Sequence, residues 1–333
     1  MKRAAILGAG AWGTALATVL ARKGEKVTLW TRRGDLAAEI ARNRENRRYL
    51  PGTVLADAIY VTSDLARALS GADVVLLAIP SHAMRAFVAE ASTLLPHDAA
   101  LVSATKGIEN DSLMLMREVI LDVMGPAIDG RLTVLSGPSF AREVALELPT
   151  ALVVAGVSPK NAAEVQSRCA TDRLRVYTSD DPTGVELGGA LKNVIAIAAG
   201  ACDGLGYGHN SRAALITRGL AEMVRLSMAK GGNALTLAGL SGLGDLVLTC
   251  TGELSRNRTV GIEMGRGRAL PDVLAGLGHV AEGVKTAKSA YDLGRKYNVE
   301  MPITTEVYRV LYEGKSPKQA VSDLMARALR PEF

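Results

Sequence analysis

Short runs of apolar residues alternate with amphipathic segments over the first half of the chain. The apolar runs predict strands over residues 3–7, 26–30, 73–79, 99–104, 132–135, 150–155 and 173–178. Several of the segments between them show helical spacing, which predicts helices over residues 14–23, 35–45, 82–95, 112–123 and 139–147. Apolar strands that alternate with helices form a doubly wound parallel sheet, buried on both faces. The pattern therefore predicts a Rossmann-like α/β domain.

The pattern changes after about residue 181, where the strand-like runs stop. Helical periodicity continues over residues 184–201, 210–230, 234–248, 255–267, 282–298, 303–312 and 316–328. A length of 333 residues is enough for about two domains. We therefore expect a dinucleotide-binding (Rossmann) domain over residues 1–183 and an all-helical substrate-binding domain over residues 184–333.

Composition and charge exclude several classes of protein. The net charge is only +5 and no polybasic run is present, so we expect neither a nucleic-acid partner nor a membrane-surface partner. Three widely spaced cysteines argue against a disulfide framework or a zinc site and favour a reducing, cytoplasmic compartment. The four histidines show no metal-ligand spacing, so no metal is expected. Glycines and charges interrupt every long apolar run, which argues against membrane insertion.

The first 24 residues, MKRAAILGAGAWGTALATVLARKG, have two interpretations. Two basic residues before an apolar run are typical of a secretory signal peptide. A turn at Gly24, the strand-like residues 27–30 and four glycines from Gly8 to Gly24 argue against a signal. We therefore expect this stretch to remain in the mature protein as a strand, a turn and a helix.

Gly8, Gly10 and Gly13 form a Gly-x-Gly-x-x-Gly turn between the first strand and the first helix. Such glycines permit a tight turn, the approach of a pyrophosphate and close packing of the helix on the strand. The N–H groups at the helix N-terminus then face the phosphates. The alternative is a glycine-rich turn without a ligand.

Arg32 and Arg33 follow the second strand. An acidic residue at this place holds the ribose hydroxyls of NAD, whereas an arginine pairs with the 2′-phosphate of NADP. The two arginines therefore favour NADP, with NADPH as the preferred reductant, while the nearby Asp35 leaves NAD open. The alternative is that both arginines are solvated surface residues.

Two polar loops follow predicted strands, at the sheet edge where open α/β folds bind ligands. Lys106 follows the strand over residues 99–104 and would neutralise an anionic or carbonyl substrate. Gly137 and Ser139 lie in a Ser-Gly-Pro-Ser turn whose N–H groups would hold a carbonyl or phosphate oxygen. A solvated lysine and an ordinary helix start, with Ser139 as N-cap, are the alternatives.

Lys192 shares a helical face with small and apolar residues, namely Gly188, Ile195, Ala196 and Ala199. Desolvation lowers the pKa of a lysine toward neutrality and suits it to general acid or base catalysis. The alternative is a lysine whose chain extends to water.

Ser255, Arg256 and Asn257 stand in succession at a predicted helix start, shortly after Asp245. A guanidinium pairs with phosphate through two hydrogen bonds, and serine and asparagine add neutral donors at a helix N-terminus. The cluster therefore predicts a phosphate site, with a capped surface helix as the alternative.

Taken together, these motifs resemble NAD(P)-dependent glycerol-3-phosphate dehydrogenase of the bacterial type. The motifs occur in the order GAGAWGTALA, NRRYLPG, ATKGIE, LSGPSFAREV, ELGGALKNVIAIAAG, GLSGLGDLVLTCTGELSRNR and VAEGVKTA. The likeness runs over essentially the whole chain. It implies the reversible reduction of dihydroxyacetone phosphate to sn-glycerol 3-phosphate, which supplies phospholipid synthesis, and it implies a homodimer.

The resemblance also implies roles for individual residues. Lys192 matches the general acid/base and contacts the substrate, and Lys106 matches a residue that contacts substrate and cofactor. The other substrate positions are Gly137, Ser139, Asp245, Ser255, Arg256 and Asn257. The other cofactor positions are Gly8, Gly10, Ala11, Trp12, Gly13, Arg32, Arg33, Tyr49, Ala141, Arg256, Val280 and Glu282. The family often has serine in place of Ala11, so a hydroxyl contact to the pyrophosphate is lost while the backbone contacts remain.

The residues suit this chemistry, since Lys192 would protonate the oxygen of the reduced carbonyl and Asp245 would orient Lys192 or a substrate hydroxyl. Two other functions stay open. A related β-hydroxyacid dehydrogenase also has a nicotinamide domain, a helical domain and a catalytic lysine. Its substrates carry a carboxylate, however, and the cluster at Arg256 suits a phosphate better. A non-catalytic NADP-binding sensor would need no lysine on an apolar face.

Overall fold

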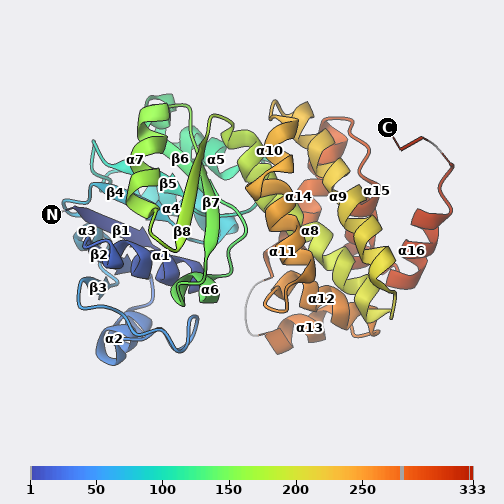
Figure 1. Cartoon of the computed structure of the whole chain (residues 1–333), viewed down its shortest axis with the longest axis horizontal. Helices are drawn as coiled ribbons and strands as arrows, with labels where there is room; N and C mark the ends of the chain where they lie inside the picture. Colours follow the sequence, from blue (N-terminus) through green and yellow to red (C-terminus); the bar gives the residue numbers. More distant parts are fainter. Residues whose placement is uncertain (1, 278–280, 330, 333) are drawn as a thin grey trace. The chain divides into compact units, whose positions relative to one another are not determined.

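The computed structural model describes residues 2–277, 281–329, 331 and 332. The chain divides into two compact units (Figure 1). Unit 1 comprises Met1–Lys106 and Met114–Glu186, and unit 2 comprises Gly107–Leu113 and Leu187–Phe333. The short segment Gly107–Leu113 belongs to unit 2 although it lies in the first half of the sequence. A hydrogen bond of 3.3 Å from the Ser289 hydroxyl to the Ile108 carbonyl oxygen links it to that unit.

Unit 1 is built on one eight-stranded sheet with the strand order β3-β2-β1-β4-β5-β6-β7-β8 (Figure 1). The strands are β1 (Arg3–Leu7), β2 (Lys26–Trp30), β3 (Ile59–Thr62), β4 (Val74–Leu77), β5 (Ala100–Ser103), β6 (Leu132–Ser136), β7 (Thr150–Ala155) and β8 (Leu174–Ser179). All neighbours pair in parallel except β6 and β7. The predicted Rossmann-like fold class is confirmed, with a sheet that is mostly parallel.

Two features of the sheet differ from the prediction. β7 runs antiparallel to β6, because the helix between them, α6 (Ala141–Ala145), has only five residues. A parallel connection needs a helix long enough to recross the sheet. β3 was missed because it has only four residues and one of them, Tyr60, is 42% exposed, which leaves little apolar signal.

Helices cover both faces of this sheet. They are α1 (Ala11–Arg22), α2 (Gly34–Asn43), α3 (Leu65–Leu69), α4 (Met84–Ala91), α5 (Met116–Met124), α6 and α7 (Pro159–Cys169), with 3₁₀ turns at Ser81–Ala83 and Pro126–Arg131. Along β1, Ala4 and Ile6 belong to one buried cluster, and Ala5 and Leu7 to another. Because successive side chains of a strand point to opposite faces, both faces are apolar and the strand reads as a continuous apolar run.

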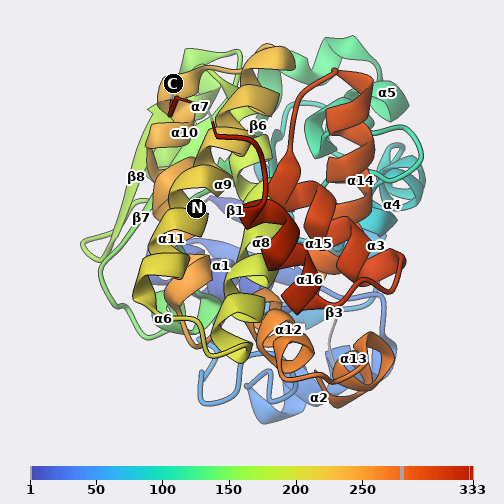
Figure 2. The same cartoon turned by 90° about the vertical axis from the view of Figure 1, so that its right-hand side faces the viewer.

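The regular elements of unit 2 are helices, joined by loops, and no named strand lies among its described residues, as predicted. Its helices are α8 (Pro182–Gly204, which starts in unit 1), α9 (His209–Ala229), α10 (Ala234–Ala238), α11 (Asp245–Thr251), α12 (Arg256–Gly265), α13 (Leu270–Leu277), α14 (Glu282–Lys296), α15 (Pro302–Tyr312) and α16 (Pro317–Met325). α14, α15 and α16 lie next to one another in sequence order (Figure 2). α13 was not predicted, since proline and glycine interrupt its apolar pattern.

The helix predicted over residues 234–248 is divided into three parts. α10 ends at Ala238 with Gly239 as its C-cap, a π-helical turn follows over Leu240–Gly244, and α11 continues from Asp245. The backbone folds tightly here, because a Cβ on Gly242 would lie 2.0 Å from the Leu237 carbonyl oxygen. The break places Asp245 in the first turn of a new helix, where its side chain is fully buried.

α8 is the one helix among the described residues that is long and apolar enough to cross a membrane. Its most apolar window is 89% buried inside the protein. Such burial is typical of the core helix of a soluble protein, and α8 has that place in unit 2.

Candidate functional site

The turn between β1 and α1 has two glycines that the fold requires and one that it does not. Gly8 has φ +124°, and a Cβ there would lie 2.3 Å from the Ala78 carbonyl oxygen. A Cβ on Gly13 would lie 1.9 Å from the Gly8 carbonyl oxygen. A Cβ on Gly10, by contrast, would have no protein atom within 4 Å. The open space beside Gly10 fits the close approach of a ligand to the backbone.

The start of α1 offers further groups to such a ligand. Gly10 is its N-cap, and no side chain caps the helix there. Its first N–H groups therefore face outward with the positive end of the helix dipole, which suits a pyrophosphate. Ala11 and Trp12 are the first two residues of α1, and the half-buried Trp12 has an indole N–H without a hydrogen-bond partner.

Asn46 supports this turn, a residue to which the sequence analysis gave no role. Its fully buried amide donates to the Ala9 carbonyl oxygen at 2.9 Å and to the Thr14 hydroxyl at 2.8 Å. The Asn46 side-chain oxygen accepts from the Tyr49 backbone N–H at 3.2 Å. Asn46 thereby connects the glycine turn with Tyr49, one of the predicted cofactor residues. Only its place at the head of the NRRYLPG motif could have indicated this.

The two arginines after β2 have different surroundings. The Arg33 guanidinium forms an ion pair with Asp35, and this contact lowers the pKa of the Asp35 carboxyl to about 2. The Asp35 carboxyl is therefore ionised at neutral pH. Arg32 is exposed, and within the described part of the chain its side chain makes no hydrogen bond or ion pair. Arg32 is thus the arginine that remains available to an anionic ligand.

Lys106, Gly137 and Ser139 lie together beyond the ends of the neighbouring strands β5 and β6. The Gly137 carbonyl oxygen accepts from Lys106 Nζ at 3.3 Å and from the Ser139 hydroxyl at 3.2 Å. Gly137 has φ +130°, a conformation that favours glycine. Ala141 begins the short helix α6 just after this group.

Two serines at the ends of these strands have unpaired hydroxyls. Ser103 ends β5 and Ser136 ends β6, and both side chains are at least 95% buried. Neither hydroxyl has a hydrogen-bond partner in the protein. Buried polar groups without partners are rare and often lie near a bound water or ligand. The two hydroxyls thus add unpaired polar groups to the edge of the sheet at the ends of β5 and β6.

In unit 2, Lys192 of α8 lies between two polar side chains of α11. Its Nζ forms an ion pair with Asp245 and donates to the Thr249 hydroxyl at 2.9 Å. The Thr249 hydroxyl in turn donates to the Asp245 carbonyl oxygen at 2.6 Å. Lys192 is 7% exposed and Asp245 is 0% exposed, so Lys192 does not extend to water. The arrangement holds one proton-carrying amine beside a buried counter-charge.

Thr249 was not among the predicted site residues. Asp245 and Thr249 are four residues apart, a spacing that puts two side chains on one face of a helix. That spacing lies inside the GLSGLGDLVLTC motif and is the sequence signal that could have indicated Thr249. The buried Cys250 beside it is no nucleophile, since burial raises the pKa of its thiol to about 12.

The phosphate-type cluster at the start of α12 divides into exposed and inward-facing groups. The Ser255 hydroxyl accepts from the Arg258 N–H at 3.2 Å, so it also caps the helix. The Asn257 amide donates to the Asn193 side-chain oxygen at 2.9 Å, and its own oxygen accepts from the Gly283 N–H at 3.0 Å. Arg256 is exposed, and among the described residues its side chain has no hydrogen-bond or ion-pair partner.

One predicted cofactor residue, Glu282, lies at the start of α14. Glu282 is its first residue and Ala281 its N-cap. Val280 lies outside the residues that the structure describes. The predicted roles of both residues stay predictions.

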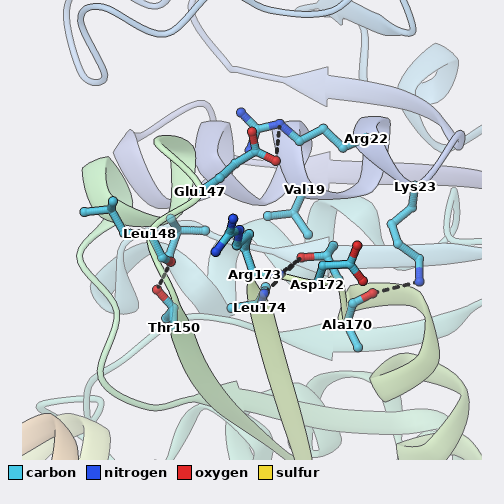
Figure 3. A pocket seen from close by; sticks show the side chains of 12 residues that line it. Val19, Arg22, Lys23, Glu147, Leu148, Thr150, Ala170, Asp172, Arg173 and Leu174 are labelled. Atoms are coloured by element: carbon cyan, nitrogen blue, oxygen red, sulfur yellow. Dashed lines mark hydrogen bonds and ion pairs between the residues drawn. The ribbon is translucent and has the colours of Figure 1, made fainter.

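Unit 1 also contains a cavity of about 540 Å³ that none of the predicted site residues lines (Figure 3). Charged side chains and the first residues of β7 and β8 surround it. Arg22 pairs with Glu147 at 3.7 Å, and Lys23 donates to the carbonyl oxygens of Ser167 and Ala170. Because two of its cations already serve protein groups and no predicted site residue lines it, we assign the cavity no part in the chemistry. Across the described residues, no three histidine, cysteine or acidic side chains are grouped as metal ligands.

Comparisons with known proteins give a consistent result. Residues 3–163 match the family model of the NAD-dependent glycerol-3-phosphate dehydrogenase N-terminus, and residues 181–322 match that of its C-terminus. The chain is 55% identical to glycerol-3-phosphate dehydrogenase (NAD(P)+) of Geobacter sulfurreducens, over 99% of both chains. It is 52% identical to the enzyme of that name from Myxococcus xanthus, again over 99% of both.

Solved structures agree with this. The crystal structure of glycerol-3-phosphate dehydrogenase from Coxiella burnetii has a TM-score of 0.93 and 42% identity, covering 98% of this chain and 99% of that one. A ketopantoate reductase from Ralstonia eutropha has a TM-score of 0.59 and 18% identity, covering 96% of this chain and 100% of that one. The second likeness is one of fold alone.

Proposed function

Since the chain belongs to the family of NAD-dependent glycerol-3-phosphate dehydrogenases, we propose that it reduces dihydroxyacetone phosphate to sn-glycerol 3-phosphate, reversibly, for glycerophospholipid synthesis. The observation that carries this proposal is the buried contact of Lys192 with Asp245 and Thr249. A ketone reductase needs one proton donor of fixed position at the carbonyl oxygen, and Lys192 meets that need.

The residues of unit 2 account for the proton transfer. When bound, the dinucleotide supplies the hydride that reduces the C2 carbonyl. Negative charge then develops on the C2 oxygen, and Lys192 Nζ donates a proton to it. Asp245 supplies a buried counter-charge beside the Lys192 amine, and Thr249 fixes the direction of Nζ through its hydroxyl. In the reverse direction Lys192 removes the same proton.

The start of α12 would hold the phosphate of the substrate. The exposed Arg256 guanidinium is available for a bidentate contact, and the N–H groups of the first turn add neutral donors. The Ser255 hydroxyl accepts from the helix and keeps its own hydrogen for a phosphate oxygen. A carboxylate substrate would use fewer of these donors, which favours the phosphate ester. We also assign Lys106, Gly137 and Ser139 to the substrate, on the basis of their common place beyond β5 and β6.

The enzyme uses NAD(P), and we infer that it prefers NADPH. The open Gly10 turn and the uncapped start of α1 fit the pyrophosphate. Arg32 would pair with the 2′-phosphate that distinguishes NADP from NAD. Asp35 is occupied by Arg33 and is a weaker acceptor for the ribose hydroxyl of NAD than a free carboxylate. NADH therefore remains a usable but poorer reductant.

We further propose that residues 1–183 form the dinucleotide-binding domain, which also contributes Lys106, Gly137 and Ser139 to substrate binding, and that residues 184–333 form the substrate-binding domain. We also propose a cytoplasmic homodimer. The cytoplasmic location is supported by three buried, free cysteines, which suit a reducing compartment. The dimer rests on the family resemblance.

A substrate panel tests the function. Purified protein should oxidise NADPH with dihydroxyacetone phosphate. The kcat/KM for 2- and 3-oxo acids that lack a phosphate should be at least about 100-fold lower, because these substrates would lose the charged contacts of the site. The decrease in NADPH absorbance measures both. Preferential turnover of an oxo acid would favour a β-hydroxyacid dehydrogenase. NADPH binding without turnover of any substrate would favour a sensor.

A further inference from the structure

α8 and α12 pack backbone against backbone through four glycines. At each of them a Cβ would lie 2.0–2.5 Å from a carbonyl oxygen of the other helix. These glycines are Gly200 and Gly204 of α8 and Gly261 and Gly265 of α12. No side chain fits at such distances, so the main chains themselves set the separation of the two helices.

The contacts also fix how the helices run. Gly200 lies against Arg258, and Gly204 lies against Ile262 and Gly265. Because the contacts advance together along both sequences, α12 runs beside α8 in the same direction. Its first residues then lie beside the part of α8 that carries Lys192, in agreement with the 2.9 Å hydrogen bond between the side chains of Asn193 and Asn257.

A buried carboxylate locks this arrangement. Asp203 of α8 accepts from Arg258 of α12 at 2.7 and 3.0 Å, and from Arg212 of α9 at 2.5 and 3.0 Å. The Asp203 side chain is 9% exposed. Arg258 donates to one Asp203 oxygen through two of its nitrogens, and this contact opposes rotation of α12 about its axis and sliding along α8. Arg258 is thereby withdrawn from ligands, while Arg256, two residues earlier, stays exposed.

We propose that the glycine contact between α8 and α12, locked by Asp203, sets the distance from Lys192 to the phosphate-binding start of α12. This distance selects substrates in which a single methylene joins the ketone to the phosphate ester. The inference rests on the proposed function, in which Lys192 protonates the carbonyl oxygen and the start of α12 holds the phosphate. Asp203 and the four glycines are positioning residues, since they reach the substrate only through Lys192 and α12.

The physical basis is the rigidity of two helices in main-chain contact. When the phosphate of a substrate with one more methylene is bound at the start of α12, its carbonyl carbon would lie beyond Lys192. The displacement would be roughly one carbon–carbon bond, about 1.5 Å. A displacement of that size costs about 100-fold in rate when reacting groups must be aligned. The site would therefore discriminate by length rather than by charge.

Gly261→Ala tests this directly. The new Cβ would lie 2.0 Å from the Ile197 carbonyl oxygen, and ordinary contact begins at 3.4 Å, so the helices must separate by roughly one bond length. The probes are two phosphonates, 4-hydroxy-3-oxobutylphosphonate, which has the size of dihydroxyacetone phosphate, and its homologue with one more methylene. Wild type should favour the shorter probe by about 100-fold in kcat/KM. Gly261→Ala should reduce this ratio by about tenfold.

Gly276→Ala is the matched control, because that helical glycine has no atom nearer than 3.9 Å to an added Cβ. It should leave the ratio unchanged. Asp203→Asn is a second variant, which adds no atoms to the contact between the helices. It tests the proposal even if α12 fails to pack in Gly261→Ala. It should raise the KM for the shorter probe more than it lowers kcat, leave the KM for NADPH unchanged and reduce the ratio by about threefold.

The outcomes separate the two proposals. Equal losses on both phosphonates in Gly261→Ala and Asp203→Asn would overturn the inference and leave the proposed function standing. A wild-type protein that reduces neither dihydroxyacetone phosphate nor the shorter phosphonate would overturn the proposed function itself.

Discussion

Asp35 and Asp203 each hold one arginine of a closely spaced pair, and the other arginine has no ion-pair partner among the described residues. Asp35 pairs with Arg33 and leaves Arg32, while Asp203 pairs with Arg258 and leaves the arginine at position 256. An arginine held by a carboxylate has its hydrogen-bond donors already oriented toward the protein. At the scale of residues, each carboxylate thus binds one guanidinium, and the other guanidinium of the pair is available to a phosphate group.

The first prediction concerns the cofactor. Arg32→Ala should raise the KM for NADPH by about 10- to 100-fold, because a lost hydrogen bond to a charged group costs about 1.5–3 kcal/mol. The KM for NADH should change by less than about twofold, since NADH lacks the 2′-phosphate. Steady-state kinetics with both reductants measures this. Arg33→Ala is the control and should have the smaller effect on NADPH. An equal effect of Arg32→Ala on both reductants would remove the 2′-phosphate assignment.

The turn from β1 to α1 shows how one element combines fold and function. Gly8 and Gly13 leave no room for a side chain, because their Cβ positions lie within 2.3 Å of carbonyl oxygens. Gly10 has free space around it and extended backbone dihedrals that alanine also adopts. The first two glycines therefore belong to the packing of unit 1, and we assign Gly10 to the ligand.

This difference predicts opposite results for two similar variants. Gly13→Ala should lower the free energy of unfolding by about 1–3 kcal/mol, because the added methyl overpacks the turn. Gly10→Ala should lower it by less than about 1 kcal/mol, the scale of a changed N-cap, and should instead raise the KM for NADPH by about tenfold or more. Thermal unfolding and NADPH kinetics on both variants measure this. A Gly10→Ala enzyme with wild-type affinity for NADPH would contradict the assignment of that glycine.

At the scale of the whole molecule, regular features of the chain were predictable and tertiary ones were not. The buried strands could be predicted from their apolar runs, because both faces of the sheet are covered. The long helices could be predicted from their helical periodicity, and the apolar sequence of α8 reflects its place as a core helix. The direction of β7 and the break before Asp245 depend on local chain geometry that apolar patterns do not encode.

The candidate site shows the same limit. Lys192 and the start of α12 could be predicted, since their residue types are unusual at those places in a helix. Asn46 and Asp203 could not be predicted, because the contacts that give them their roles join distant parts of the sequence. Asn46 contacts Thr14, 32 residues away, and Asp203 contacts Arg258, 55 residues away. Such contacts appear only when the chain is folded.

The most direct test of the account is Lys192→Ala, because the proposed reaction has this one proton donor. We predict that kcat for dihydroxyacetone phosphate falls by about 100- to 10,000-fold, the usual contribution of general acid catalysis, while NADPH still binds. Lys318→Ala, on an exposed position of α16, is the control and should keep wild-type activity. Hydride transfer near the wild-type rate in Lys192→Ala, with normal NADPH binding, would contradict the central claim.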